Sequence, residues 1–302
     1  MIQLALWGIV LGSVIALGAV GLTLIWGITD LFNAAHGDQM TVGAYVTLLV
    51  VSVFADLGIL QATVGPFSFP WAVLVGIIPA IIVSAVLAIA IDIAIYRPLR
   101  RWGATSITGF IASVGVAWGL RGLIYVLWGA DFHFYASGIR PMATFLGLRI
   151  RTDELFIIAV AWTATAATYI FLMNTKMGKA LRALSDNAEL ARVAGIDTDR
   201  MVMWAWAIAG ILIALAGTLY GIQTQLRAEM GWIFLLPLFA AIILGGQGSI
   251  TGAAVGGLVL GMAQQMSTQW LRPTYKPAVA FMIMVLALMF RPQGIFGEKE
   301  SR

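Results

Sequence analysis

The sequence has no cysteine, only two histidines and few charged residues, which make up 11% of the chain. Without cysteine there is no disulfide framework, no thiolate zinc site and no cysteine nucleophile. His36 and His133 lie far apart and have no carboxylates at metal-ligand spacing. The chain also lacks a G-x-x-x-x-G-K-[ST] loop for nucleotide phosphates and a G-x-S-x-G elbow. We therefore predict no catalytic residues, no metal and no cofactor.

Apolar residues are abundant instead: 61% of the 302 residues are hydrophobic, and the mean hydropathy is +0.94. An ordinary soluble domain is roughly 45–50% apolar and about 25% charged. So much apolar surface requires lipid as the solvent. The small net charge of +4 is typical of loops that face anionic lipid, and it argues against a nucleic-acid partner.

The apolar residues gather into segments of the length needed to cross a membrane, about 20 residues each. We identify nine: 4–28, 39–55, 71–96, 105–128, 155–173, 202–225, 232–244, 250–265 and 275–290. The second, seventh and eighth are short and lie beside polar or glycine-rich breaks, a pattern typical of broken or re-entrant helices. The prediction is a single all-α, polytopic membrane domain, 1–302, with eight to ten transmembrane helices.

Basic residues in the connections set the predicted orientation, because they favour the cytoplasm. The first of them is Arg97, so we expect no cleaved signal peptide with a basic start. Connections 97–101, 174–201 and 291–302 hold more basic residues than the alternate connections. This predicts an outside N-terminus, a cytoplasmic C-terminus, a cytosolic loop at 174–201 and an extracytoplasmic loop at 129–153. The flipped topology is the alternative.

An internal parallel repeat is a second hypothesis. Three spans end at Tyr96-Arg97-Pro98, and three others end at Phe290-Arg291-Pro292. Parallel repeats recur in transporters. Arginine followed by proline is, however, also an ordinary helix stop at the interface.

The polar segment 30–38 separates the first two spans. We expect Gly37 to end one helical piece, while Asn33 and Asp38 are residue types that cap the next. Such a turn leaves backbone amides free for a carboxylate near membrane depth. Asn33, His36, Gly37 and Asp38 are therefore candidate substrate-path residues, and a plain interfacial turn is the alternative.

Two further segments carry patterns. Glycines at four-residue spacing follow 244–249, and these favour tight helix packing. A gate or hinge formed by Gly245, Gly246, Gly248 and Gly252 is the other interpretation.

In the loop 176–197, Asp186 and Glu189 resemble a capping box, which predicts a short amphipathic helix over 187–194 that stops at Gly195. This helix is either a docking knob for a cytosolic partner or a solvated loop.

Single charges within the spans are the last signal. Arg121 lies roughly 24 Å from the inner end of its span, so we expect it to snorkel outward. Asp92 is expected at the inner interface, too far from Arg121 in depth to pair with it. The alternative is that Arg121 contacts the substrate.

Taken together, several strings resemble the branched-chain amino acid permease family of binding-protein-dependent ABC importers, and the chain looks like the smaller permease of the pair. These strings are GLTLIWG at 21–27, NAAHG at 33–37 with GAY at 43–45, YRPLR at 96–100, the loop 178–196, LGGQGS at 244–249 and RPQGIFG at 291–297.

The resemblance implies a translocation path shared with a second permease subunit, two cytosolic ABC ATPase subunits that hydrolyse ATP, and an extracytoplasmic solute-binding protein. It implies import of branched-chain or other hydrophobic amino acids across a prokaryotic cell membrane. In that family the loop at 178–196 meets the ATPase, and the matching positions here are Gly178, Ala183, Asn187, Ala188, Ala191 and Gly195. The alternatives are urea or short amides on the same scaffold, and an autonomous secondary transporter.

Overall fold

The computed structural model describes residues 1–136, 142–145, 148–291 and 293–297. Its elements in chain order are α1 (Ile2–Thr29), α2 (Ala35–Asp56), α3 (Trp71–Ile91), the π-helical turn η1 (Asp92–Tyr96), α4 (Arg97–Arg101), α5 (Ser106–Trp128), β1 (Met142–Phe145), β2 (Leu148–Arg151), α6 (Thr152–Asn174), α7 (Lys176–Asp186), α8 (Ala188–Val193), α9 (Thr198–Gln223), α10 (Met230–Gly245), α11 (Ile250–Ser267), the 3₁₀ turn η2 (Pro273–Tyr275) and α12 (Lys276–Phe290). The strands β1 and β2 form one antiparallel hairpin.

All nine apolar segments coincide with helices to within a few residues, which confirms the all-α polytopic fold. Within the described ranges, seven helices are long and apolar enough to cross a membrane on their own: α1, α2, α3 with its continuation to Arg101, α5, α6, α9 and α12 preceded by η2. The 16-residue α10 is shorter, and the glycines and glutamines of α11 lower its hydropathy. The nine segments therefore comprise seven clear spans and two weaker helices.

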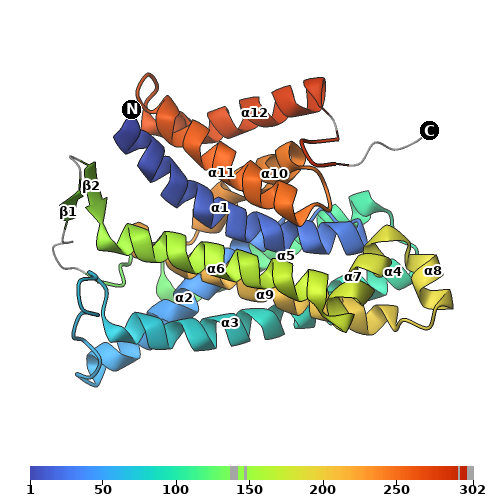
Figure 1. Ribbon diagram of the computed structural model, residues 1–302. Helices are drawn as coiled ribbons and strands as arrows, with labels where there is room; N and C mark the ends of the chain where they lie inside the picture. The colour runs from blue at the N-terminus through green and yellow to red at the C-terminus, as the bar shows by residue number, and fades with distance from the viewer. Residues whose placement is uncertain (137–141, 146–147, 292, 298–302) are drawn as a thin grey trace.

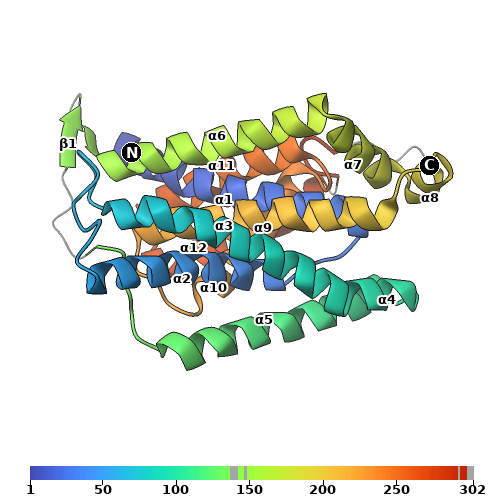
Figure 2. The ribbon, with the colours of Figure 1, turned by 90° about the horizontal axis from the view of Figure 1, so that it is seen from below.

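The bundle has two central helices and several peripheral ones. Helices α1 and α9 are mostly buried, whereas α3, α5, α6 and α12 are largely exposed. Figure 1 shows β1 and β2 at one end of the bundle, together with the start of α1, and α7 and α8 at the other. We call these ends the hairpin end and the α8 end. Helices α5 and α6 lie along opposite edges (Figure 2).

Close backbone approach holds the core of the bundle together, as the glycine spacing predicted. A Cβ atom placed on Gly261 of α11 would lie 2.2 Å from the Cα atom of Gly12 in α1, and one placed on Gly257 would lie 2.5 Å from that of Ala16. Lipid supplies no hydrophobic drive between helices, so packing of small residues replaces it. Any larger side chain at these two glycines would push α1 and α11 apart.

The Arg97-Pro98 pair does not stop a helix. The helix continues from α3 through η1 into α4, and Pro98 occupies the first turn of α4. Proline is tolerated there because the first turn leaves amides without helical partners, and the wider π turn before it resets the hydrogen-bond register. The matching pair at Arg291 does follow the end of α12, but Pro292 lies outside the described residues. The parallel repeat therefore stays a prediction.

Candidate functional site

The start of α2 places polar side chains in the interior of the bundle. Asp30, in a left-handed conformation with φ 48°, ends α1, and a non-helical segment leads back to α2. The His36 ring nitrogen Nε2 lies 3.2 Å from the carbonyl oxygen of Gly18, a residue near the middle of α1. Asn33, His36 and Asp38 are fully buried. Helix α2 therefore begins well inside the membrane-spanning part of the molecule.

Two details of the predicted turn are wrong. Gly37 does not end a helical piece but is the third residue of α2, where its backbone meets Gly231 of α10; a Cβ there would lie 2.3 Å from the Gly231 oxygen. Gly37 therefore allows α2 and α10 to cross with their backbones in close contact. The nearby amides are also not free, because those of Ala34 and Ala35 donate to Ser113 Oγ and Asn33 Oδ1 at 2.9 and 3.1 Å.

A buried ion pair joins α2 to α5. Arg121 donates through Nε and Nη2 to both carboxylate oxygens of Asp38, each at 3.0 Å, and both side chains are buried. The prediction that Arg121 snorkels outward is wrong. The parallel geometry of these two hydrogen bonds suits a guanidinium and a carboxylate, and in a low-dielectric interior the two charges stabilise each other. Sequence spacing gave no signal for a partner 83 positions away.

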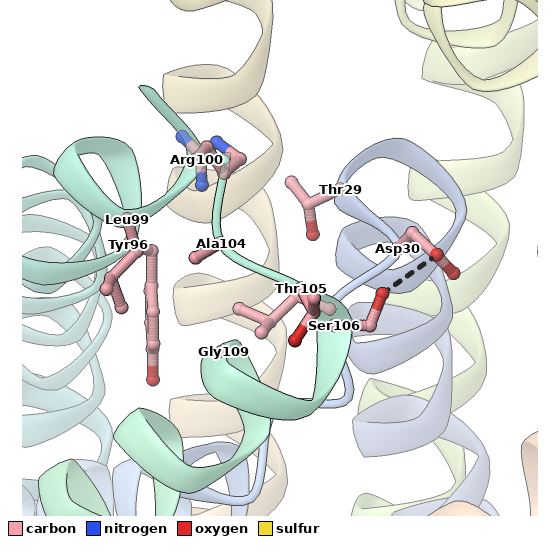
Figure 3. Close-up of a pocket in the computed structure, with 10 residues that line it drawn as sticks. Thr29, Asp30, Tyr96, Leu99, Arg100, Ala104, Thr105, Ser106 and Gly109 are labelled. Carbon is pink, nitrogen blue, oxygen red and sulfur yellow. Dashed lines mark hydrogen bonds between the residues drawn. The ribbon is translucent and has the colours of Figure 1, made fainter. Parts of the chain in front are cut away.

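Asp92 is also buried in the protein, and Arg100 donates to it at 2.7 Å. Its depth at the inner interface stays a prediction. The next turn carries Tyr96, whose hydroxyl donates to Asn33 Oδ1 at 3.1 Å. Tyr96 lines a small cavity of about 60 Å³ at the α8 end. Figure 3 shows Tyr96, Leu99 and Arg100 on one side of this cavity and the start of α5 on the other, where Ser106 donates to Asp30. The buried Asn33 is thus linked through Tyr96 to a cavity near one end of the bundle.

Several buried polar atoms at the start of α2 have no hydrogen-bond partner within the described part of the chain. They are Asn33 Nδ2, His36 Nδ1 and both amide atoms of Gln39. A buried polar group without a partner costs roughly 1–3 kcal/mol. Such atoms are candidate partners for a polar ligand or a water molecule. Gln39 was not among the predicted residues, although it lies one turn after His36.

The helix predicted over 187–194 is confirmed as α8. Its N-cap is Asn187, whose Oδ1 accepts the Leu190 amide at 2.9 Å, so the cap is not Asp186 as the capping-box pattern suggested. Gly195, with φ 85°, terminates it as predicted. Leu190 and Val193 are 66% and 86% exposed. Helix α8 is therefore a short helix that is capped at both ends and exposes apolar side chains. We call α8 the knob.

The other predicted coupling positions lie in α7 and α8. Gly178 of α7 lies so near α6 that a Cβ would come within 2.4 Å of the Leu172 Cα atom. Ala191 is the one described α8 residue that is buried, Ala183 of α7 is half-buried, and Ala188 is exposed. Small residues thus allow α7 to pack closely on α6 and α8 to pack on its neighbours.

The glycine loop at 246–249 connects α10 to α11 at the α8 end. Gly246 and Gly248 have φ values of 107° and 76°, which side chains with a Cβ rarely adopt. Gly245 and Gly252 touch across the loop, since a Cβ on Gly245 would lie 2.0 Å from the Gly252 oxygen. Residues 293–297 pack beside the same loop, where the amides of Ile295 and Phe296 donate to the carbonyls of Leu244 and Gly245.

The end of α1 contacts both α7, which precedes the knob, and this loop. Ser185 of α7 donates to the Gly27 carbonyl at 2.7 Å, and the Gly248 amide donates to Thr23 Oγ1 at 3.1 Å. All four residues line one cavity of about 40 Å³. Helix α7 and the glycine loop therefore rest on the same turns of α1, the helix that also contacts His36.

The bundle of apolar helices, with a polar interior turn and an exposed helical knob, has the architecture of a polytopic membrane protein of the permease class. Within the described ranges, no group of three or more His, Asp or Glu residues is placed to hold a metal. Residues 4–288 match the model of the family described as branched-chain amino acid transport system / permease component, and the chain belongs to this family.

Relatives with assigned functions agree with this membership. The chain is 31% identical to the high-affinity branched-chain amino acid transport system permease protein LivH of Salmonella typhimurium, over 97% of this chain and 94% of LivH. It is 28% identical to BraD of Pseudomonas aeruginosa, with the same coverage of both chains. It is also similar to PsaBC from Streptococcus pneumoniae in complex with Fab, with a TM-score of 0.50, 15% identity and coverage of 97% and 93%, which supports the fold alone.

Proposed function

We propose that this chain is the permease subunit of an ATP-driven importer for branched-chain or other hydrophobic amino acids. It would form the translocation path with a second permease subunit, two cytosolic ABC ATPases and an extracytoplasmic binding protein. The observation that carries the proposal is the bare apolar knob α8 on a chain whose sequence has no nucleotide-binding loop. Energy must then enter through a protein contact, and the knob offers one.

The proposed orientation places the α8 end in the cytoplasm of a prokaryotic cell, with the N-terminus outside and the C-terminus inside. One observation supports it. The basic residues of 97–101 and 174–201 gather at the α8 end, in line with the positive-inside tendency. In this orientation the knob lies on the side where the proposed ATPases would hydrolyse ATP.

The proposed path uses the polar start of α2. A zwitterion with an aliphatic side chain needs apolar walls and a few polar partners. Asn33 and His36 each keep a buried nitrogen without a partner, which the substrate would satisfy when the path opens. Gly37 would let α2 slide against Gly231, and Asp38 would hold α2 to α5 through Arg121.

Motion of the knob would reach this path through α1. In this proposal Gly178, Ala183, Asn187, Ala188, Ala191 and Gly195 form the coupling element, and Gly245, Gly246, Gly248 and Gly252 form the hinge. The contacts of Ser185 with Gly27 and of Gly248 with Thr23 support it, because both elements bear on one helix end.

The alternatives receive less support. LivH and BraD carry the name of branched-chain amino acids, and urea or amides are not named among the relatives reported above. A secondary transporter needs a mid-membrane carboxylate that takes up and releases an ion. Asp38 and Asp92, the two buried carboxylates of the first three spans, are already bound by arginines.

The test is leucine uptake in proteoliposomes. We expect uptake only when the second permease, the ATPases, the binding protein and ATP are all present. Uptake by this chain alone, driven by an ion gradient and unaffected by ATP, would contradict the proposal. Within the complete system, His36→Ala tests the path; unchanged rates and substrate preference would remove His36 from it.

A further inference from the structure

Buried polar atoms without a partner extend beyond the start of α2. Besides the amides of Asn33 and Gln39, the hydroxyl of Ser84 in α3 and the indole nitrogen of Trp206 in α9 have no hydrogen-bond partner within the described ranges. All four side chains are fully buried. Helices α2, α3 and α9 pack against one another in pairs (Figure 1). The question is whether these atoms lie together where the three helices meet.

Close contacts fix the alignment of α2 and α9. A Cβ placed on Gly43 of α2 would lie 2.5 Å from the Cα atom of Ala214 in α9. Four residues further along both helices, the hydroxyls of Thr47 and Thr218 share a hydrogen bond of 2.9 Å. The two helices therefore run in the same direction, and residues at matching steps along them lie opposite each other.

One turn earlier, the same alignment places Gln39 opposite Gly210. Gln39 lies four residues before Gly43, on the same face of α2, and Gly210 lies four residues before Ala214. Gly210 is in turn packed on α3, since a Cβ there would lie 2.7 Å from the carbonyl oxygen of Ser84. The amide of Gln39 and the hydroxyl of Ser84 therefore lie at one level of the junction between the three helices.

Trp206 and Asn33 occupy the next level toward the α8 end. Trp206 lies four residues before Gly210, and its ring stacks on that of Tyr96, with the ring centroids 5.0 Å apart. The Tyr96 hydroxyl donates to Asn33 Oδ1 at 3.1 Å. One tyrosine thus joins the indole of Trp206 to the amide of Asn33, and each of these keeps an N–H group without an acceptor.

From this arrangement we infer that the charged groups of the substrate bind between α2, α3 and α9. We call Asn33, Gln39, Ser84 and Trp206 the junction cluster. The inference rests on the proposed function and deepens it, because it adds three residues to the path and gives them a role. The N–H groups of Asn33, Gln39 and Trp206 suit a carboxylate, and the oxygens of Gln39 and Ser84 suit an ammonium group.

The chemistry of the cluster selects a zwitterion. Its four members are neutral, and a buried ion of one sign would need an opposite charge beside it. The buried carboxylates Asp38 and Asp92 are bound by Arg121 and Arg100, so they leave no net charge to attract an inorganic ion. An amino acid carries both signs, so hydrogen bonds to neutral groups are sufficient to hold it.

The cluster is closed in this structure, because all four side chains are fully buried. A substrate would enter only when α3 or α9 moves away from α2. Helix α9 begins at Thr198, and only residues 194–197 separate it from the knob. Motion of the knob would therefore act directly on the helix that carries Trp206.

The test separates substrate binding from stability. Gln39→Met keeps the length of the side chain and removes its amide, and Ser84→Ala removes the hydroxyl. An unpartnered buried group contributes no hydrogen bond, so its removal does not destabilise the fold. We expect the purified importer to unfold at or above the wild-type temperature. In proteoliposomes with saturating loaded binding protein, the leucine imported per ATP hydrolysed should fall roughly tenfold, the loss expected for one hydrogen bond to a charged group.

Thr218→Val is the matched control. Thr218 is also buried and polar and lies on the same helix as Trp206, but its hydroxyl is already paired with Thr47 and with the Ala214 carbonyl. This variant should lose stability and keep the wild-type ratio of leucine to ATP. The inference is overturned if Gln39→Met and Ser84→Ala both keep that ratio, if both unfold well below the wild type, or if Thr218→Val loses as much transport as they do.

A labelling experiment locates the substrate directly. A leucine analogue with a diazirine in its side chain is irradiated during ATP-driven uptake by the complete importer. We expect adducts on the peptides of α2, α3 and α9 that hold the junction cluster, and a strong reduction of these adducts in Gln39→Met but not in Thr218→Val. Adducts confined to other helices of this chain, or to the other subunits, would contradict the inference.

Failure of the inference is distinguishable from failure of the proposed function. ATP-dependent leucine uptake by the wild type, with unchanged ratios in Gln39→Met and Ser84→Ala, rejects the junction cluster and keeps the function. Uptake by the wild-type chain alone that ignores ATP rejects the function itself.

Discussion

The start of α2 and the knob α8 both follow short breaks between helices, yet the first is enclosed and the second is exposed. Asn33, His36 and Asp38 are fully enclosed, and one side-chain nitrogen of Asn33 and one of His36 have no partner among the described residues. The knob exposes Leu190 and Val193. The enclosed region thus holds buried polar atoms, and the knob holds exposed apolar side chains. In the proposed function the first receives the substrate and the second contacts the ATPase.

Helix α1 contacts the start of α2 and also α7, the helix that precedes the knob. Its middle accepts a hydrogen bond from His36 through Gly18, and its end accepts one from Ser185 at Gly27. Close backbone contact also holds α1 against α11. In the proposed function, force received at the knob would reach the enclosed polar turn through α7 and α1.

The largest effect on stability is expected from a substitution in the enclosed region at the start of α2. Asp38→Ala leaves Arg121 buried without its partner, and removal of one member of a buried ion pair destabilises a protein by about 3–5 kcal/mol. We expect a large fall in the thermal unfolding temperature of the detergent-purified chain. In the double variant Asp38→Ala with Arg121→Met, most of the stability should return, because no charge then remains buried. If Asp38→Ala is as stable as the wild type, the ion pair does not hold α2 to α5.

The exposed region should respond in the opposite way. Leu190→Asp and Val193→Asp are expected to change the stability of the chain by no more than about 0.5 kcal/mol, since both side chains are exposed. Loss of an apolar anchor from an interface costs roughly 1.4 kcal/mol or more, which is about tenfold in affinity. ATP-driven uptake and co-purification of the ATPase should fall accordingly. Leu57→Asp, exposed at the other end of α2, is the control. Normal uptake by both α8 variants would remove the knob from coupling.

The glycine loop lies between the two regions and gives an intermediate prediction. Gly246→Ala meets backbone atoms of Gly297 and places a side chain at φ 107°, a strain of order 1–3 kcal/mol. Gly248→Ala, at φ 76° with open space around it, suffers the conformational strain alone. We expect lower stability and uptake for Gly246→Ala than for Gly248→Ala. Equal losses in the two variants would show that backbone conformation, and not contact with the C-terminal string, controls the loop.

The smallest effect concerns pH at the hairpin end. The Tyr125 hydroxyl donates to Glu229, and this hydrogen bond holds the pKa of Glu229 below its ordinary value. A lowered pKa in the folded state means that the carboxylate stabilises the fold above its ordinary pKa and loses this effect as the pH falls through the folded value. Thermal unfolding between neutral and acidic pH should therefore show a small additional loss for the wild type that Glu229→Gln lacks. Parallel profiles would assign no stabilising role to this contact.

The sequence was sufficient for features that depend on local pattern. The nine helices follow from runs of apolar residues, because each run must satisfy its own backbone in lipid. The knob and its glycine stop follow from capping residues within one turn. The tight packing at Gly257 and Gly261 follows from spacing along a single helix.

The site required long-range information. Asp38 meets Arg121 across 83 positions, and Tyr96 meets Asn33 across 63. No local spacing encodes such pairs, so Arg121 looked like a residue that snorkels and Gly37 like a helix stop. Gln39 was missed for the same reason, since a lone amide in a polar stretch gives no sign of burial.

The sequence by itself therefore determined the solvent, the class of fold and the positions of the helices, because apolar length and backbone hydrogen bonding are properties of each segment alone. Only the tertiary structure decided which charges pair, which glycines touch a neighbour and which remain open. Those outcomes depend on which helices lie side by side, and side-by-side packing in lipid is fixed by the fit of whole helix surfaces rather than by any one of them.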